Sequence, residues 1–114
     1  MAKITIDKVK VDAIYSCVPT QKTQTTEYAL FSEVESSLFE KTTGIKERRV
    51  APDDVTCSDL CFRAAEQLIS DLTINKDEIE VLIFVSQSPD YFLPATAVTL
   101  QHKLGLSTAC MALD

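Results

Sequence analysis

The feature that most constrains the fold is a continuous apolar segment, residues 108–113, which reads Thr-Ala-Cys-Met-Ala-Leu. Such a run is typical of a strand covered on both faces, and strands of this kind lie inside parallel sheets. A similar run, residues 81–85, reads Val-Leu-Ile-Phe-Val. Between them, Pro94 marks the start of a helix that Gly105 ends. The sequence therefore predicts a parallel βαβ unit in an α/β fold.

The apolar segment is followed only by Asp114, without a turn or a polar tail. A strand that is covered on both faces needs further strands and helices around it. We therefore expect residues 1–114 to be an incomplete domain of a longer protein.

Apolar periodicity predicts two further helices. One spans residues 27–42 and ends at Gly44, which suits the left-handed position after a last turn. The other spans residues 58–72 and has Thr56 or Ser58 as its N-cap. The apolar stripes that define them are Leu30, Val34 and Leu38 in the first helix, and Leu60, Cys61, Ala64, Ala65, Leu68, Ile69 and Leu72 in the second.

The N-terminal residues show the alternation of a half-buried strand. Ile4 and Ile6 alternate with polar neighbours, and Val9 and Val11 alternate in the opposite phase. The change of phase predicts β-structure with a bulge or tight turn near residues 7–8. Residues 19–26 are polar and rich in turn-forming residues, and they are predicted to form a surface loop.

Charge and composition exclude several function classes. The net charge of −6 argues against a binder of nucleic acid or of anionic membranes, because both require a positive field. No apolar run approaches the roughly 20 residues that span a bilayer, and the charged N-terminus does not resemble a signal peptide. Four dispersed cysteines do not form a secreted disulfide framework. These features predict a cytoplasmic protein with reduced thiols.

The residues of the chain do not by themselves assemble a catalytic or metal site. The single histidine, His102, falls on the polar side of its helix and is predicted to be a surface residue. Cys57 and Cys61 are one turn apart, but no second ligand pair follows at metal-binding spacing, so no metal is expected. Cys61 lies in the apolar stripe and is predicted to be buried. The carboxylates at 53–54 and 77–80 are predicted to be solvated loop charges.

Two segments carry a family resemblance. Residues 43–51 read Thr-Gly-Ile-Lys-Glu-Arg-Arg-Val-Ala, and residues 88–97 read Ser-Pro-Asp-Tyr-Phe-Leu-Pro-Ala-Thr-Ala. Both segments, and the helix, turn and strand between them, resemble β-ketoacyl-acyl-carrier-protein synthase III of the thiolase superfamily. The resemblance covers essentially all 114 residues. The first segment is fairly specific to this enzyme and its close relatives, whereas the second is shared more widely.

The resemblance implies a thiolase-like fold, in which two similar halves pack as αβαβα layers, usually in a homodimer. This chain would form most of the first half. The nucleophilic cysteine would follow shortly after the position of Asp114, and the histidine and asparagine of the triad would lie in the second half. No catalytic residue is therefore expected in residues 1–114. Cys110 falls inside the preceding strand, and His102 is not the triad histidine.

The chemistry implied for the whole enzyme is acyl transfer in fatty acid biosynthesis. A cysteine at a helix N-terminus attacks an acyl-CoA thioester and holds the acyl group. Malonyl-acyl-carrier protein then loses carbon dioxide, and the resulting carbanion attacks the acyl group. Acyl-CoA and malonyl-acyl-carrier protein are the implied partners, and no cofactor is expected beyond the coenzyme A of the substrate.

Five positions bear on the comparison with the family pattern. Well-known members place a tryptophan and an arginine against the coenzyme A adenine where this chain has Leu38 and Thr42, which favours a different acyl donor. Leu93 falls where many members have a phenylalanine that lines the partner subunit's acyl pocket, so a longer or branched acyl chain is predicted. A core leucine is the alternative. Arg48 and Arg49 are expected either to pair with carboxylates such as Glu47 or to contact coenzyme A phosphates.

Two alternative interpretations stay open. One is a related condensing enzyme of secondary metabolism, or of the hydroxymethylglutaryl-CoA synthase type. The other, from a different class, is a non-catalytic binding module that shares only the fold. A part of an enzyme would expose apolar surface and self-associate in isolation, whereas a module would be monomeric.

Overall fold

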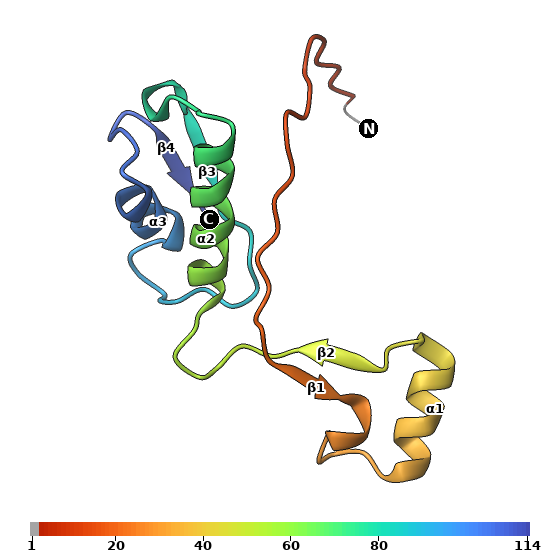
Figure 1. Ribbon diagram of the computed structural model, residues 1–114. Coiled ribbons are helices and arrows are strands. Elements are labelled where there is room, and N and C mark those ends of the chain that lie inside the picture. The colour runs from red at the N-terminus through yellow and green to blue at the C-terminus, as the bar shows by residue number, and fades with distance from the viewer. Residues whose placement is uncertain (1–2) are drawn as a thin grey trace.

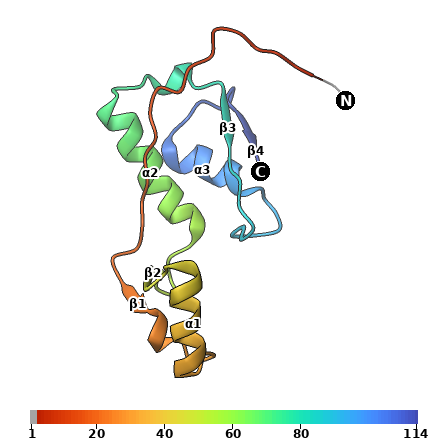
Figure 2. The ribbon, with the colours of Figure 1, turned by 90° about the vertical axis from the view of Figure 1, so that its right-hand side faces the viewer.

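The computed structural model describes residues 3–114, which form two units joined by one extended segment, residues 50–56, while a second extended segment, residues 3–20, leads into the first unit (Figures 1 and 2). The first unit contains β1 (Lys22–Gln24), the 3-10 turn η1 (Thr25–Glu27), α1 (Glu33–Thr43) and β2 (Glu47–Arg49). The second unit contains α2 (Cys57–Asp71), the 3-10 turn η2 (Lys76–Glu78), β3 (Val81–Ile83), α3 (Thr96–Leu104) and β4 (Met111–Leu113).

The second unit contains the predicted parallel βαβ arrangement. β3 and β4 pair in parallel, with Val81 opposite Met111 and Ile83 opposite Leu113. The helix between them, α3, ends at Gly105, whose φ of 65° is the left-handed conformation that favours glycine. The prediction of an α/β fold with a parallel strand pair is confirmed.

The core of the second unit lies between the sheet and two helices. Leu82 of β3 and Ala112 of β4 point toward the helices, where Phe62 of α2 packs beside them. The buried apolar residues of this core are Phe84, Ala97, Leu100, Leu104, Leu106 and Cys110. One face of the sheet is therefore covered by α2 and α3 together.

The opposite face of the sheet is open. Val81 and Ile83 of β3 are 49% and 63% exposed, and Met111 and Leu113 of β4 are 57% and 46% exposed. The prediction that these strands are covered on both faces is therefore wrong for the described residues. The open face is nevertheless apolar, and a layer that covered it would stabilise the sheet, because burial of apolar side chains is favourable.

α2 begins at Thr56, which confirms one of the two predicted N-caps. The Thr56 hydroxyl accepts from the backbone amide of Asp59, and the Asp59 carboxylate accepts from the amide of Thr56. The other candidate, Ser58, is fully buried inside the first turn. Cys61 was predicted to be buried but is exposed, because its side of α2 faces neither α3 nor the sheet.

The first unit pairs two short strands in antiparallel orientation. Thr23 of β1 lies opposite Arg48 of β2. The loop predicted up to residue 26 thus contains a strand. Its polar sequence, Lys-Thr-Gln, lacks the apolar alternation by which strands are recognised.

α1 is shorter than predicted. It begins after Ser32, whose hydroxyl accepts from the amide of Glu35, and not at residue 27. A reciprocal bond from the amide of Ser32 to the Glu35 carboxylate completes a capping box. Gly44 ends the helix with a φ of 74°, as predicted. The apolar stripe is not buried, since Val34 and Leu38 are exposed, and the one buried residue of α1 is Ser36.

The N-terminal segment differs from its prediction. Residues 3–20 contain no strand, because no neighbouring strand in residues 3–114 lies beside them to complete a ladder. Lys8 adopts a φ of 63° at the predicted change of phase. Tyr15 donates to the Asp71 carboxylate at 2.8 Å, which holds the segment beside α2 (Figure 1). Across residues 3–114, no helix combines the length and apolar character required to cross a membrane.

Candidate active-site edge

The carboxyl ends of β3 and β4 open into a hollow of about 470 Å³. In open α/β sheets, ligands bind at this edge, outside the carboxyl ends of the strands. Asp114 is the one charged residue of the lining, so the hollow is mainly apolar. We call it the carboxyl-end hollow, and its lining residues are Ile83, Phe84, Val85, Ser86, Pro89, Tyr91, Phe92 and Asp114.

Asp114 connects the end of β4 to the start of α3. Its carboxylate accepts from the backbone amides of Thr96 at 2.7 Å and Ala97 at 2.6 Å. The N-cap residue of α3, Ala95, offers no side-chain acceptor, so Asp114 satisfies amides that would otherwise be unpaired. The negative charge is also favoured there by the helix dipole. These two hydrogen bonds fix the end of β4 relative to the start of α3 at the edge of the hollow.

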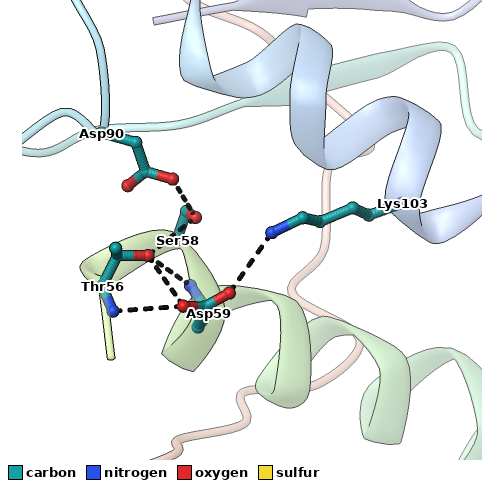
Figure 3. A network of polar contacts seen from close by, with 5 residues as sticks. All are labelled: Thr56, Ser58, Asp59, Asp90 and Lys103. Atoms are coloured by element: carbon teal, nitrogen blue, oxygen red, sulfur yellow. Dashed lines mark hydrogen bonds and ion pairs between the residues drawn. The ribbon is translucent and has the colours of Figure 1, made fainter. Parts of the chain in front are cut away.

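The loop between β3 and α3 is anchored to α2 by a partly buried pair (Figure 3). The Ser58 hydroxyl donates to the Asp90 carboxylate. The Thr56 hydroxyl lies 3.1 Å from that of Ser58 and extends the network to the capping box with Asp59. Lys103 of α3 forms an ion pair with the other side of Asp59 at 3.2 Å. The first turn of α2 therefore holds both α3 and the loop.

A group of thiols lies beside this network. The Ser86 hydroxyl donates to the sulfur of Cys57 at 3.6 Å. Partial burial raises the pKa of the Cys61 thiol, and the neighbouring Cys57, Asp90 and Cys17 raise it further. Cys61 is thus held in the protonated form, which is a weak nucleophile. Residues 3–114 hold no group of three metal-ligating side chains.

The structure places the predicted residues as follows. Leu93 is 86% exposed in the loop after the Ser58–Asp90 contact and does not pack in the core of the described residues. His102 is exposed on α3, as predicted. Cys110 is buried in the core with Leu104 and Leu106, away from the carboxyl-end hollow. No described cysteine lines this hollow.

Arg48 and Arg49 make structural contacts within the first unit. The Arg48 guanidinium lies 4.3 Å from the centre of the Tyr28 ring. Arg49 donates to the carbonyl oxygens of Pro19 at 3.1 Å and Thr20 at 3.0 Å. The expected pairing of these arginines with Glu47 is wrong, because Glu47 forms its ion pair with Lys22. A contact with coenzyme A stays a prediction.

The positions expected to face adenine lie together on α1. Leu38 and Thr42 line a hollow of about 300 Å³ with Phe31, Glu35 and Phe39. The Thr42 hydroxyl donates to the carbonyl oxygens of Leu38 and Phe39 and so is occupied by the helix backbone. This surface contains aromatic rings but no arginine.

Sequence reasoning missed three residues of the site: Ser58, Asp90 and Asp114. Ser58 is a cap candidate in the sequence, although it lies four residues before Phe62 and so on the face of α2 that packs on the core. Asp90 and Asp114 lie in segments without periodicity, where no local pattern reveals a partner. Their partners lie 32 and 18 residues away in the chain.

Comparison with known proteins identifies relatives of the predicted family. The chain is 31% identical over 101 residues to beta-ketoacyl-(acyl-carrier-protein) synthase III 2 of Halalkalibacterium halodurans. The aligned region covers 89% of the chain and 30% of that protein. It is 37% identical over 90 residues to beta-ketoacyl-(acyl-carrier-protein) synthase III of Helicobacter pylori. That aligned region covers 78% of the chain and 27% of that protein. No family profile matches the chain.

Solved structures agree with this similarity. The crystal structure of 3-oxoacyl-(acyl-carrier protein) synthase from Burkholderia xenovorans matches with a TM-score of 0.82 and 40% identity, over 87% of this chain and 29% of that one. Xanthomonas campestris OleA with bound cerulenin matches with a TM-score of 0.76 and 27% identity, over 88% of this chain and 31% of that one. The thiolase-like fold class is therefore confirmed.

The resemblance to β-ketoacyl-acyl-carrier-protein synthase III, predicted from two sequence segments, is confirmed by both comparisons. The chain spans about a third of the length of the curated relatives it matches.

Proposed function

We propose that this chain is the N-terminal portion of a β-ketoacyl-acyl-carrier-protein synthase III. The whole protein would condense an acyl-CoA with malonyl-acyl-carrier protein and so begin fatty acid synthesis. Residues 1–114 would form an incomplete half-domain without the catalytic residues. The observation that carries this proposal is similarity to synthases of that name over most of the chain, in both sequence and structure.

The carboxyl-end hollow supports an acyl substrate. Its lining is mainly apolar, and its one carboxylate, Asp114, already accepts two backbone amides. An acyl chain needs no charged partner and gains free energy by leaving water. The predicted nucleophilic cysteine, shortly after Asp114, would enter this edge from the end of β4.

The open face of the β3–β4 sheet supports a layered whole protein. Four apolar side chains on that face would be covered by another helical layer, as in the αβαβα arrangement. We further propose that the protein is a cytoplasmic homodimer in which Leu93 lines the acyl pocket of the partner subunit. Leu93 is exposed and available for such a contact.

The experiment uses the full natural protein that carries these residues. Purified protein is incubated with a series of straight and branched acyl-CoAs, and malonyl-acyl-carrier protein is then added. We expect a β-ketoacyl-carrier protein, identified by its mass, with longer or branched primers accepted because Leu93 replaces a bulkier ring. If no acyl-CoA in the series yields condensed product, the proposed function is wrong.

A related condensing enzyme is the second candidate. OleA of Xanthomonas campestris matches the chain in structure, and Leu38 and Thr42 depart from the adenine-facing pattern of the synthase family. The two candidates differ in what attacks the bound acyl group. Condensed product formed with a second acyl-CoA, and not with malonyl-acyl-carrier protein, would favour this candidate.

A further inference from the structure

The contact between Ser58 and Asp90 joins two parts of the second unit that no backbone pairing connects. Ser58 lies in the first turn of α2 and is fully buried, whereas Asp90 lies in the loop between β3 and α3. The hydroxyl of Ser58 points at the Asp90 carboxylate (Figure 3). A buried serine with a carboxylate partner 32 residues away requires an explanation beyond local helix structure.

Helix capping does not explain Ser58. The N-terminus of α2 is already satisfied by the reciprocal bonds between Thr56 and Asp59. Packing of α2 against α3 has its own ion pair between Asp59 and Lys103. The Ser58 hydroxyl is therefore not needed to cap α2, and it can donate to the loop. Its 3.1 Å contact with the Thr56 hydroxyl helps to orient it.

The loop depends on this contact for its position. Within residues 3–114, the Ser58–Asp90 bond is the only hydrogen bond that joins residues 87–94 to another element. Near the base of the loop, Ser86 contacts Cys57 and accepts from the amide of Ser88. The other carboxylate oxygen of Asp90 is buried and has no partner in the described part of the chain. Loss of the serine would leave the whole carboxylate unpaired in a buried place, which is unfavourable.

Directly after Asp90, the loop exposes three large apolar side chains at the surface of the described residues. Tyr91, Phe92 and Leu93 are all exposed, and Tyr91 and Phe92 line the carboxyl-end hollow. An anchor one residue before Tyr91 limits where these three side chains can lie. A displacement of about 1 Å at a substrate-positioning element is enough to change reaction rates strongly.

We propose that Ser58 and Asp90 are positioning residues that hold Tyr91 and Phe92 at the carboxyl-end hollow, and Leu93 directly after them, and thereby set which acyl-chain lengths the enzyme accepts. The inference rests on the proposed function, because it takes the substrate to be an acyl thioester. Neither residue touches the substrate. Each acts through the loop that follows.

The first test measures hydrogen exchange in the full natural protein. Ser58→Ala and Asp90→Ala should raise the exchange of the amides of Ser88 and residues 90–93 by about tenfold, because each removes the anchoring bond. Asp90→Asn should restore most of the protection, because its side-chain oxygen can still accept from Ser58. Ser36→Ala is the matched control, since it deletes a hydroxyl that is equally buried, 2% exposed, in α1. Unchanged exchange in both alanine variants would refute the anchor.

The second test measures chain-length selectivity in the same proteins. The ratio of acylation rates with acetyl-CoA and octanoyl-CoA should shift by about threefold or more in Ser58→Ala and Asp90→Ala, and should stay at the wild-type value in Ser36→Ala. The double variant should shift the ratio no further than either single variant, because both changes break one contact. Equal ratios in all proteins, or an equal shift in the control, would overturn the positioning role.

The two tests separate this inference from the proposed function. If the wild-type protein accepts no acyl group from any acyl-CoA, the proposed function and the selectivity claim fail together, while hydrogen exchange still decides whether the pair anchors the loop. If acylation occurs but neither exchange nor selectivity responds to the variants, only the positioning role is refuted.

Discussion

At the residue scale, a few polar side chains connect elements that the apolar core alone would leave loosely placed. Asp114 caps α3 from the end of β4, and Ser58 holds Asp90 from the first turn of α2. Asp59 joins a capping box to an ion pair with Lys103. The Asp114 contacts and the loop that carries Asp90 lie at the carboxyl edge of the parallel strands, where the proposed acyl site is formed.

Asp114→Ala should lower the free energy of unfolding of the full natural protein by about 1 kcal/mol, the usual cost of removing a helix cap. Asp114→Asn should cost less, because the amide oxygen can still accept one of the two backbone hydrogens. Urea denaturation measures both variants, and Asp53→Ala, in an exposed turn, is the control. A loss in Asp114→Ala no larger than that of the control would show that the cap does not contribute.

Asp59 should make the free energy of unfolding depend on pH. The backbone amide of Thr56, then the Lys103 ammonium and the Thr56 hydroxyl, lower the pKa of Asp59 in the folded state. Because the folded pKa lies below the unfolded one, its contribution is present above about pH 4 and is lost as the pH falls through the folded pKa.

The measurement compares the wild-type protein with Asp59→Asn by chemical denaturation at a series of pH values. The stability advantage of the wild type should be largest at neutral pH and should shrink below about pH 4. An advantage that stays constant down to strongly acidic pH would contradict the role of the ionised carboxylate.

At the scale of secondary-structure elements, the sequence predicts the features that depend only on neighbouring residues, such as helix caps and helix ends. Thr56, one of the two predicted N-caps of α2, and the glycine ends of α1 and α3 depend on neighbouring residues and are confirmed. β1 was missed because its three residues are polar, and the strand expected at residues 3–13 was wrong because strands need a partner. The Ser58–Asp90 pair could not be predicted, because no local pattern connects residues so far apart.

Both glycine ends can be tested together. Gly44→Ala and Gly105→Ala should each lower the free energy of unfolding by about 1 kcal/mol, because a side chain disfavours the left-handed conformation. The cost is conformational, since a Cβ at Gly44 would meet no atom within 4 Å and one at Gly105 would meet only the Lys76 ammonium at 3.7 Å. Asparagine at either position should cost less than alanine. Thermal denaturation that ranks asparagine below alanine would contradict this explanation.

At the scale of the whole molecule, residues 3–114 are more extended than a self-sufficient domain. Their radius of gyration is 18.6 Å, whereas a compact domain of this length has about 13 Å. Apolar side chains are exposed on the sheet, on α1 and along the N-terminal segment. The same residues would form part of a covered core if the relatives' remaining length packs against them.

The isolated chain of 114 residues should therefore self-associate. Sedimentation velocity of this chain should show species larger than a monomer, and Ile83→Lys with Leu113→Lys, on the open sheet face, should reduce them. A matched pair on the polar surface, Ser70→Lys with Gln67→Lys, should not. A monodisperse, folded monomer would instead favour the binding-module interpretation.

The most direct test of the proposed enzyme is the location of the acyl group. The full natural protein is incubated with radiolabelled or heavy acyl-CoA, digested, and its acylated peptide is identified by mass spectrometry. We expect one acyl thioester, on a cysteine other than Cys17, Cys57, Cys61 and Cys110. An acyl group on one of these four cysteines, or no acylation by any acyl-CoA, would contradict this expectation.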